Sequence, residues 1–99
     1  MAEIFVRPRA ESDILSQVEY YEAKHVGLGG NFSICIDDAM SSISQYPLLS
    51  TIVYKDIRRK LVRRFPYAIF YVLRNDNIIV LRVLGQVRDS AILKKIRRI

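Results

Sequence analysis

The spacing of apolar residues changes at Pro47, and this change constrains the fold more than any other feature of the chain. Before Pro47, apolar side chains recur three or four residues apart, which is the period of an amphipathic helix. After Pro47, apolar and polar residues largely alternate, which is the period of a strand. A helical half followed by a strand half predicts an α+β fold, in which the helices pack on one face of an antiparallel sheet.

The helical half predicts one strand and two helices, at residues 3–7, 10–25 and 31–46. Pro8 suits the first turn of a helix, because its nitrogen carries no proton that would be left unpaired there. Asn31 is a suitable N-cap for the second helix. A tight turn between the helices is indicated by three glycines, Gly27, Gly29 and Gly30. We therefore expect the two helices to form an antiparallel hairpin.

The second half predicts three strands and a short C-terminal helix, at residues 57–65, 67–73, 78–84 and 90–99. In the first of these strands, alternation places Arg59 and Arg63 on one side and Arg58 and Arg64 on the other. The expected fold is thus a single domain over residues 1–99. An N-terminal strand and a two-helix antiparallel hairpin pack on an antiparallel sheet of three to four strands, and the short helix follows.

Charge is divided unequally between the two halves. Residues 1–50 carry three basic and seven acidic side chains, a balance of −4, whereas residues 51–99 carry thirteen basic and three acidic ones, a balance of +10. Such segregation predicts that the second half meets an anionic partner: nucleic acid, an enzyme that handles nucleic acid, or an acidic protein. The alternative is a well-solvated surface. Because the helices cover one face of the sheet, we expect the strand arginines to gather on the opposite face.

The motif that follows the helices is specific. Residues 58–71 read Arg-Arg-Lys-Leu-Val-Arg-Arg-Phe-Pro-Tyr-Ala-Ile-Phe-Tyr, and the pattern continues through residues 76–84 to Arg88 and Asp89. This arginine-rich strand, the corner Phe65-Pro66-Tyr67 and the aromatic strand after it resemble the ParE/RelE toxin superfamily, with the ParE-like branch favoured. The two-helix half with its glycine turn fits as well, so the resemblance spans nearly the whole chain.

The resemblance implies a small bacterial toxin of the plasmid-stabilisation kind, produced together with an unstable antitoxin. ParE-like members inhibit DNA gyrase, whereas RelE-like members cut messenger RNA in the ribosomal A site. Cleavage of RNA usually needs a general acid and base. The family's ribonucleases often carry a tyrosine or histidine near the C-terminus, but residues 85–99 contain neither, and Gly85 stands where many relatives have histidine. We therefore expect a gyrase inhibitor. The alternatives are a ribosome-dependent endoribonuclease and an inactive relative that only binds antitoxin.

Six arginines are candidates for binding the target or stabilising phosphate, and no residue is assigned a catalytic role: Arg58, Arg59, Arg63, Arg64, Arg82 and Arg88. Arg82 interrupts an apolar strand, where a charge is costly unless it is paired or faces a ligand. An ion pair between Arg82 and Asp56 or Asp89 is the structural alternative.

Other reactive residue types have simpler explanations. His25 is expected at the end of the first helix, where positive charge favours the helix dipole. Cys35 is expected to be a small buried hydrophobe, and Tyr67 and Tyr71 to belong to the core rather than to stack on bases. We expect no metal and no cofactor. The predicted partner is a cognate antitoxin with an acidic amphipathic segment that folds on contact, in a cytoplasmic hetero-oligomer with no membrane association.

Overall fold

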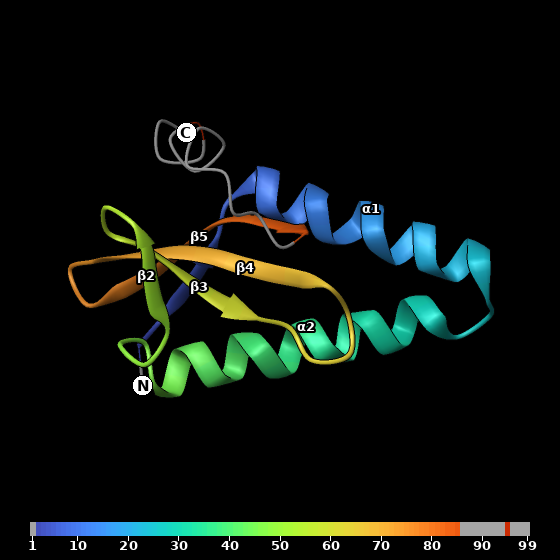
Figure 1. The fold of residues 1–99 in the computed structure, drawn as a ribbon, viewed down its shortest axis with the longest axis horizontal. Coiled ribbons are helices and arrows are strands. Elements are labelled where there is room, and N and C mark those ends of the chain that lie inside the picture. The colour runs from blue at the N-terminus through green and yellow to red at the C-terminus, as the bar shows by residue number, and fades with distance from the viewer. Residues whose placement is uncertain (1, 86–94, 96–99) are drawn as a thin grey trace.

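Two helices and four strands follow a short first strand in the computed structural model, which describes residues 2–85 and 95. In chain order the elements are β1 (Ile4–Val6), α1 (Pro8–Lys24), α2 (Leu28–Gln45), β2 (Thr51–Tyr54), β3 (Ile57–Leu61), β4 (Tyr67–Arg74) and β5 (Asn77–Gly85). The predicted α+β fold and its helical hairpin are confirmed (Figure 1). The predicted helix at residues 90–99 lies outside the described residues.

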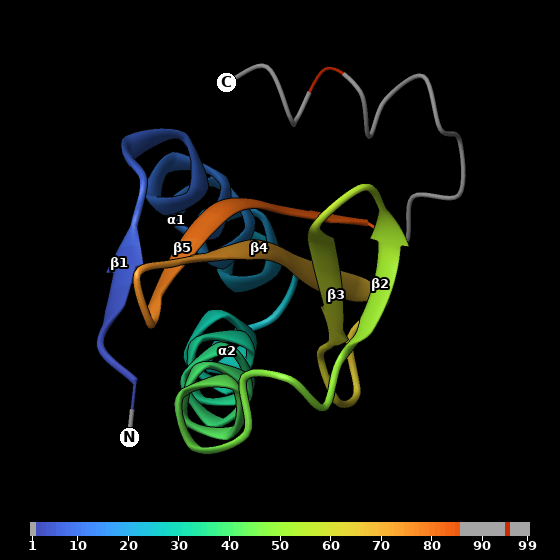
Figure 2. The same cartoon turned by 90° about the vertical axis from the view of Figure 1, so that its left-hand side faces the viewer.

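Within the described residues the sheet has five strands, in the order β1-β5-β4-β3-β2. The sequence predicted three to four antiparallel strands, and two details differ. β1 pairs with β5 in parallel, and the helical hairpin connects β1 at one edge of the sheet to β2 at the other. β2 is an additional strand of four residues that pairs with β3. Figure 2 shows how strongly the sheet twists, with β2 and β3 running across β4.

The turn between the helices is organised by a carboxylate from α1. The backbone N–H of Gly27 donates to the Glu22 carboxylate at 2.9 and 3.1 Å, and the N–H of Gly29 donates to it at 3.0 Å. These bonds satisfy donors that begin a helix without an intrahelical partner. Consequently α2 starts at Leu28, and the prediction of Asn31 as its N-cap is wrong. Gly27 adopts a φ of 89°, a conformation that glycine reaches without strain.

The main core lies between the hairpin and the sheet. The helices contribute Ala10, Phe32, Ile36, Ala39 and Ile43, and the strands contribute a matching set of aromatic and branched residues, among them Ile69, Tyr71, Ile78, Val80 and Val83. Four aromatic rings pack together at one end of this core, with centroids 4.9 to 6.2 Å apart: Tyr21, Phe32, Phe65 and Tyr67. Tyr71 is fully buried, as predicted.

The sheet face away from the helices carries a second apolar cluster. Its buried members are Ile57, Ala68, Phe70, Val72 and Leu81. We expected the arginines to gather on this face, and the cluster explains why most do not: an apolar surface leaves little room for unpaired charge. Neither helix in the described part of the chain combines the length and apolarity that a membrane crossing needs.

Candidate functional site

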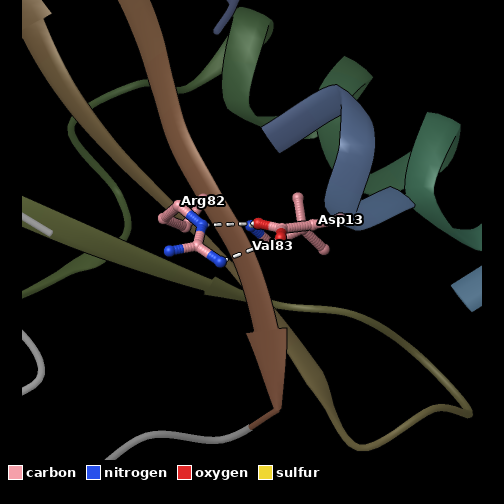
Figure 3. A network of polar contacts seen from close by, with 3 residues as sticks. All are labelled: Asp13, Arg82 and Val83. Carbon is pink, nitrogen blue, oxygen red and sulfur yellow. Dashed lines mark hydrogen bonds and ion pairs between the residues drawn. The ribbon is translucent and has the colours of Figure 1, made fainter. Parts of the chain in front are cut away.

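Arg82 is bound by a carboxylate from α1. Its Nε donates to Asp13 Oδ2 at 2.7 Å and its Nη2 donates to Asp13 Oδ1 at 2.9 Å (Figure 3). The backbone N–H of Val83 donates to the same carboxylate at 3.0 Å. β1 pairs with β5 only at residues 78–80, so Asp13 takes the place of a neighbouring strand on the side of β5 that β1 no longer covers.

The ion pair is shielded from water, since the side chains of Arg82 and Asp13 are 17% and 15% exposed. The hydrogen bond to Asp13 raises the pKa of Arg82 above its ordinary value, while burial acts in the opposite direction. The structural alternative considered for Arg82 is therefore what the structure contains, but with Asp13 as the partner. Asp56, one of the expected partners, instead pairs with Arg74 at 2.8 Å.

Arg58 is also engaged, although its partners are backbone carbonyls. Its Nη1 donates to the carbonyl of Leu48 at 3.1 Å and to that of Ser50 at 2.8 Å. The hydroxyl of Tyr71 donates to the carbonyl of Pro47 at 2.7 Å. Together these bonds fix the loop between α2 and β2, so Arg58 has a positioning role that its sequence context did not reveal.

Arg63 and Arg64 lie in a turn, not in the strand that the sequence predicted over residues 57–65. β3 ends at Leu61, and the N–H of Val62 then donates to the carbonyl of Tyr67 across the turn. Arg64 adopts a φ of 72°, which ends the extended conformation and directs the chain into the corner. Both arginines are exposed as a result.

A groove runs between α2 and this turn, and we call it the α2–β3 groove. It consists of three adjoining hollows of about 210, 260 and 250 Å³ that share lining residues. One wall comes from α2 and its C-cap: Asn31, Ile34, Cys35, Asp38, Ser42 and Tyr46. The other wall comes from β3 and the turn: Arg59, Lys60, Leu61, Arg63 and Arg64. Residues 31, 35, 38 and 42 share one face of α2, which is why they meet the same groove.

The groove wall carries four cations from β3 and the turn. In the described part of the chain, the structure gives no ion pair or side-chain hydrogen bond to Arg59, Lys60, Arg63 or Arg64. The register with Phe70 and Ile69 places Arg59 on the face away from the helices and Lys60 on the face toward them. Three of the six candidate arginines therefore border one groove, whereas Arg58 and Arg82 serve the fold. Arg88 lies outside the described residues.

The histidine and the two tyrosines that the sequence analysis singled out lie elsewhere or are engaged, whereas Cys35 lies at the groove. His25 is exposed as the C-cap of α1, as predicted. The Tyr67 hydroxyl donates to Gln17 Oε1 at 2.6 Å, and burial, followed by the neighbouring Tyr21, raises the pKa of Tyr67. Cys35 is half-buried and lines the groove. Among residues 2–85 and 95, no three His, Cys, Asp or Glu side chains gather as metal ligands would.

Sequence reasoning missed two features of this site. Lys60 was not singled out, although it lines two of the three hollows. Its place on the helix-facing side of a strand, next to Arg59 on the other side, was the available signal. The acidic residue Asp38 on the opposite wall was also missed, because no pattern in the sequence links α2 to residues 60–64.

The family model and two solved structures that this chain is similar to come from toxin–antitoxin systems. Residues 4–90 match the family described as ParE toxin of type II toxin-antitoxin system, parDE. The fold is similar to a chain of the chromosomal ParDE TA system from P. aeruginosa, with a TM-score of 0.77 and 13% identity, covering 88% of this chain and 98% of that one. It is also similar to a chain of the toxin-antitoxin complex RelBE2 from Mycobacterium tuberculosis, with a TM-score of 0.61 and 14% identity, covering 86% and 98%. No curated protein matches the chain.

Proposed function

The chain belongs to the ParE toxin family of type II toxin–antitoxin systems, and from this premise we propose that it inhibits DNA gyrase by binding it. The family match over residues 4–90 carries the proposal. Its physical support is the set of cations around the α2–β3 groove, which have no partner within the described chain. Cations of this kind would favour an acidic region on the surface of the target.

We further propose that a cognate antitoxin neutralises the toxin through an acidic, amphipathic segment. The exposed surface of the groove supports this. The groove side of the molecule exposes large apolar residues next to its cations, with Ile34 60% and Leu61 48% exposed. A segment that combines carboxylates with apolar side chains would satisfy both kinds of surface, and would bury them from water.

The positions of His25, Tyr67 and Tyr71, the acid–base candidates of the sequence analysis, favour binding without chemistry over RNA cleavage. A cleaving enzyme needs a group within hydrogen-bond reach of the reacting hydroxyl. Tyr67 and Tyr71 use their hydroxyls for internal bonds, and His25 is the C-cap of α1 and lines none of the three hollows of the groove. On this basis the free arginines contribute contact and charge rather than a proton.

A supercoiling assay with purified protein and gyrase tests the proposal. We expect the toxin to reduce supercoiling, and the Arg63→Glu variant to reduce it less, since that variant places a negative charge on the groove wall. Arg9→Glu is the matched control, because it makes the same charge change at an exposed position in the first turn of α1. Unchanged supercoiling with the native toxin would contradict the proposal. Primer extension on translated messenger after induction would then show whether the toxin cuts RNA instead.

A further inference from the structure

We propose that the toxin anchors itself to its target through an apolar projection at the connection from α2 to β2. Four residues form this projection, which we call the 46–52 patch: Tyr46, Leu48, Leu49 and Ile52. The inference rests on the proposed function, because the occupant we commit to is the folded target, which is DNA gyrase under that proposal. It goes further by naming the anchoring surface and the site that it fits, an apolar hollow with acidic residues at its rim.

The first argument concerns exposure. The 46–52 patch presents four large apolar side chains within seven residues, and each is more than half exposed, with Leu48 at 67% and Leu49 at 78%. The connection that carries them runs along the outside of the molecule from the end of α2 to β2 (Figure 2). Single exposed apolar residues are ordinary on a protein surface, whereas contiguous ones mark a surface that another molecule covers.

The second argument concerns how the patch is held. The Arg58 guanidinium donates to two carbonyls of the loop, and the Tyr71 hydroxyl donates to a third. The N–H of Leu49 donates to the carbonyl of Tyr46 at 3.1 Å within the loop itself. Because Arg58 and Tyr71 belong to β3 and β4, the sheet supports the loop from beneath. A surface that is ordered before binding loses less conformational entropy when its partner arrives.

The third argument concerns shape, and it decides between a folded target and an extended segment of an antitoxin. Leu48 and Ile52 line none of the three hollows of the α2–β3 groove, so they form a projection and not the wall of a cleft. An apolar projection gains most when it fills a pocket on the partner. Folded proteins offer such concave sites, whereas an extended segment does not.

The fourth argument concerns charge. Arg59 and Lys60 line the same hollow as Tyr46 and Leu49, and no acidic side chain is among the described residues that line it. Tyrosine and arginine are also the residue types that contribute most often to the centre of an interface. Two copies that met through this patch would bring their cations together, which disfavours self-pairing. Acidic residues around an apolar hollow would complement the patch.

Paired serine variants test the patch. In Leu48→Ser/Leu49→Ser, we expect the toxin concentration that half-inhibits gyrase supercoiling to rise about tenfold, which corresponds to about 1.4 kcal/mol. Leu15→Ser/Val26→Ser is the matched control, because these side chains are 61% and 86% exposed in the helical hairpin, and it should inhibit as the native toxin does. Circular dichroism checks that both variants fold. Native inhibition by Leu48→Ser/Leu49→Ser would overturn the proposal, and so would an equal loss in the control.

Growth assays separate this inference from the proposed target. If the native toxin arrests growth but leaves gyrase unimpaired, the gyrase proposal fails alone. Arrest that is lost in Leu48→Ser/Leu49→Ser and kept in Leu15→Ser/Val26→Ser would then still assign the target contact to the patch.

Two further measurements exclude other occupants. We expect Leu48→Ser/Leu49→Ser to copurify with a coexpressed antitoxin as the native toxin does, and to elute at the same size. Loss of copurification would assign the patch to the antitoxin instead. A native dimer that dissociates in this variant would assign the patch to a second copy of the chain, and either result would overturn the proposal.

Discussion

The contact between α1 and β5 and the contact between α2 and β3 each contain an aspartate and an arginine, but the two contacts differ in whether these residues pair. Between α1 and β5, a helix carboxylate and a strand guanidinium, Asp13 and Arg82, form a shielded ion pair. Between α2 and β3, Asp38 and Arg63 together line two of the hollows, and the structure gives no ion pair between them. An ion pair closes the seam between α1 and β5, whereas the seam between α2 and β3 is an open groove lined by charged residues.

The difference follows from which backbone groups still need a hydrogen-bond partner at each seam. At the α1–β5 seam, β1 ends before β5 does, and the carboxylate of Asp13 binds both the N–H of Val83 and the guanidinium of Arg82. At the α2–β3 groove, the loop carbonyls are already bound by Arg58 and Tyr71, and the wall cations have no such task. An arginine in a strand is thus not a functional residue by type. Its role depends on whether nearby backbone groups or a carboxylate bind it.

The largest effect should come from breaking the closed seam. In Asp13→Ala, both Arg82 and the N–H of Val83 lose their partner in a shielded place, and we expect a loss of about 3 kcal/mol in the free energy of unfolding. Urea denaturation followed by circular dichroism measures this. Asp13→Asn, which keeps an oxygen acceptor but no charge, should lose less. If Asp13→Ala were as stable as the native chain, the seam would not depend on this carboxylate.

A slightly smaller effect is expected where the helices approach each other. A Cβ at Gly29 would lie 2.6 Å from the carbonyl oxygen of Val18 and 2.9 Å from Cβ of Glu22, so Gly29→Ala must push α1 and α2 apart. We expect a loss of about 2 kcal/mol. At Gly30 nothing lies within 4 Å of an added Cβ. Gly30→Ala should therefore leave stability unchanged or raise it by about 0.5 kcal/mol. Similar melting temperatures for the two variants would contradict this close approach.

A third prediction concerns Tyr67, which bonds to α1 through Gln17. Tyr67→Phe removes one hydrogen bond and should cost about 1 kcal/mol at neutral pH. Because burial raises the pKa of Tyr67 in the folded state, its protonated hydroxyl contributes stability below about pH 10, and that contribution is lost as pH rises through the raised value. The native chain should thus lose its advantage over Tyr67→Phe in alkaline solution. Unfolding curves of both chains between neutral and strongly alkaline pH would reveal the convergence, and a constant difference would contradict it.

The smallest effect on stability is expected in the open seam. Arg64 holds a left-handed backbone conformation that glycine adopts without cost, so Arg64→Gly should change the free energy of unfolding by less than about 0.5 kcal/mol. The same variant removes a cation from the groove wall and should reduce toxicity on induction without antitoxin. Full toxicity in a stably folded Arg64→Gly chain would separate this residue from function.

The sequence anticipated the fold well, because the apolar spacing on either side of Pro47 is long and regular. It failed where short-range signals compete. β2 is only four residues long, and the loop before it exposes Leu48 and Leu49, so alternation there was weak. Likewise, Asn31 looked like a helix start because the true capping group, Glu22, lies five residues before the glycine that it binds.

The candidate arginines illustrate the same limit. Arg58, Arg63 and Arg82 all lie in segments rich in strand-forming residues, and the sequence treats them alike. Only the fold separates them, by bringing loop carbonyls to Arg58 and the carboxylate of Asp13, sixty-nine residues away, to Arg82.

By itself, the sequence determined the helical hairpin, the strand-rich second half and the concentration of positive charge in that half, because periodicity and charge are local properties of the chain. Only the tertiary structure decided which of the cations in the described part of the chain are bound by other groups. Whether an arginine is paired depends on groups that are distant in sequence, and their positions follow from the register of the sheet and the packing of two helices upon it.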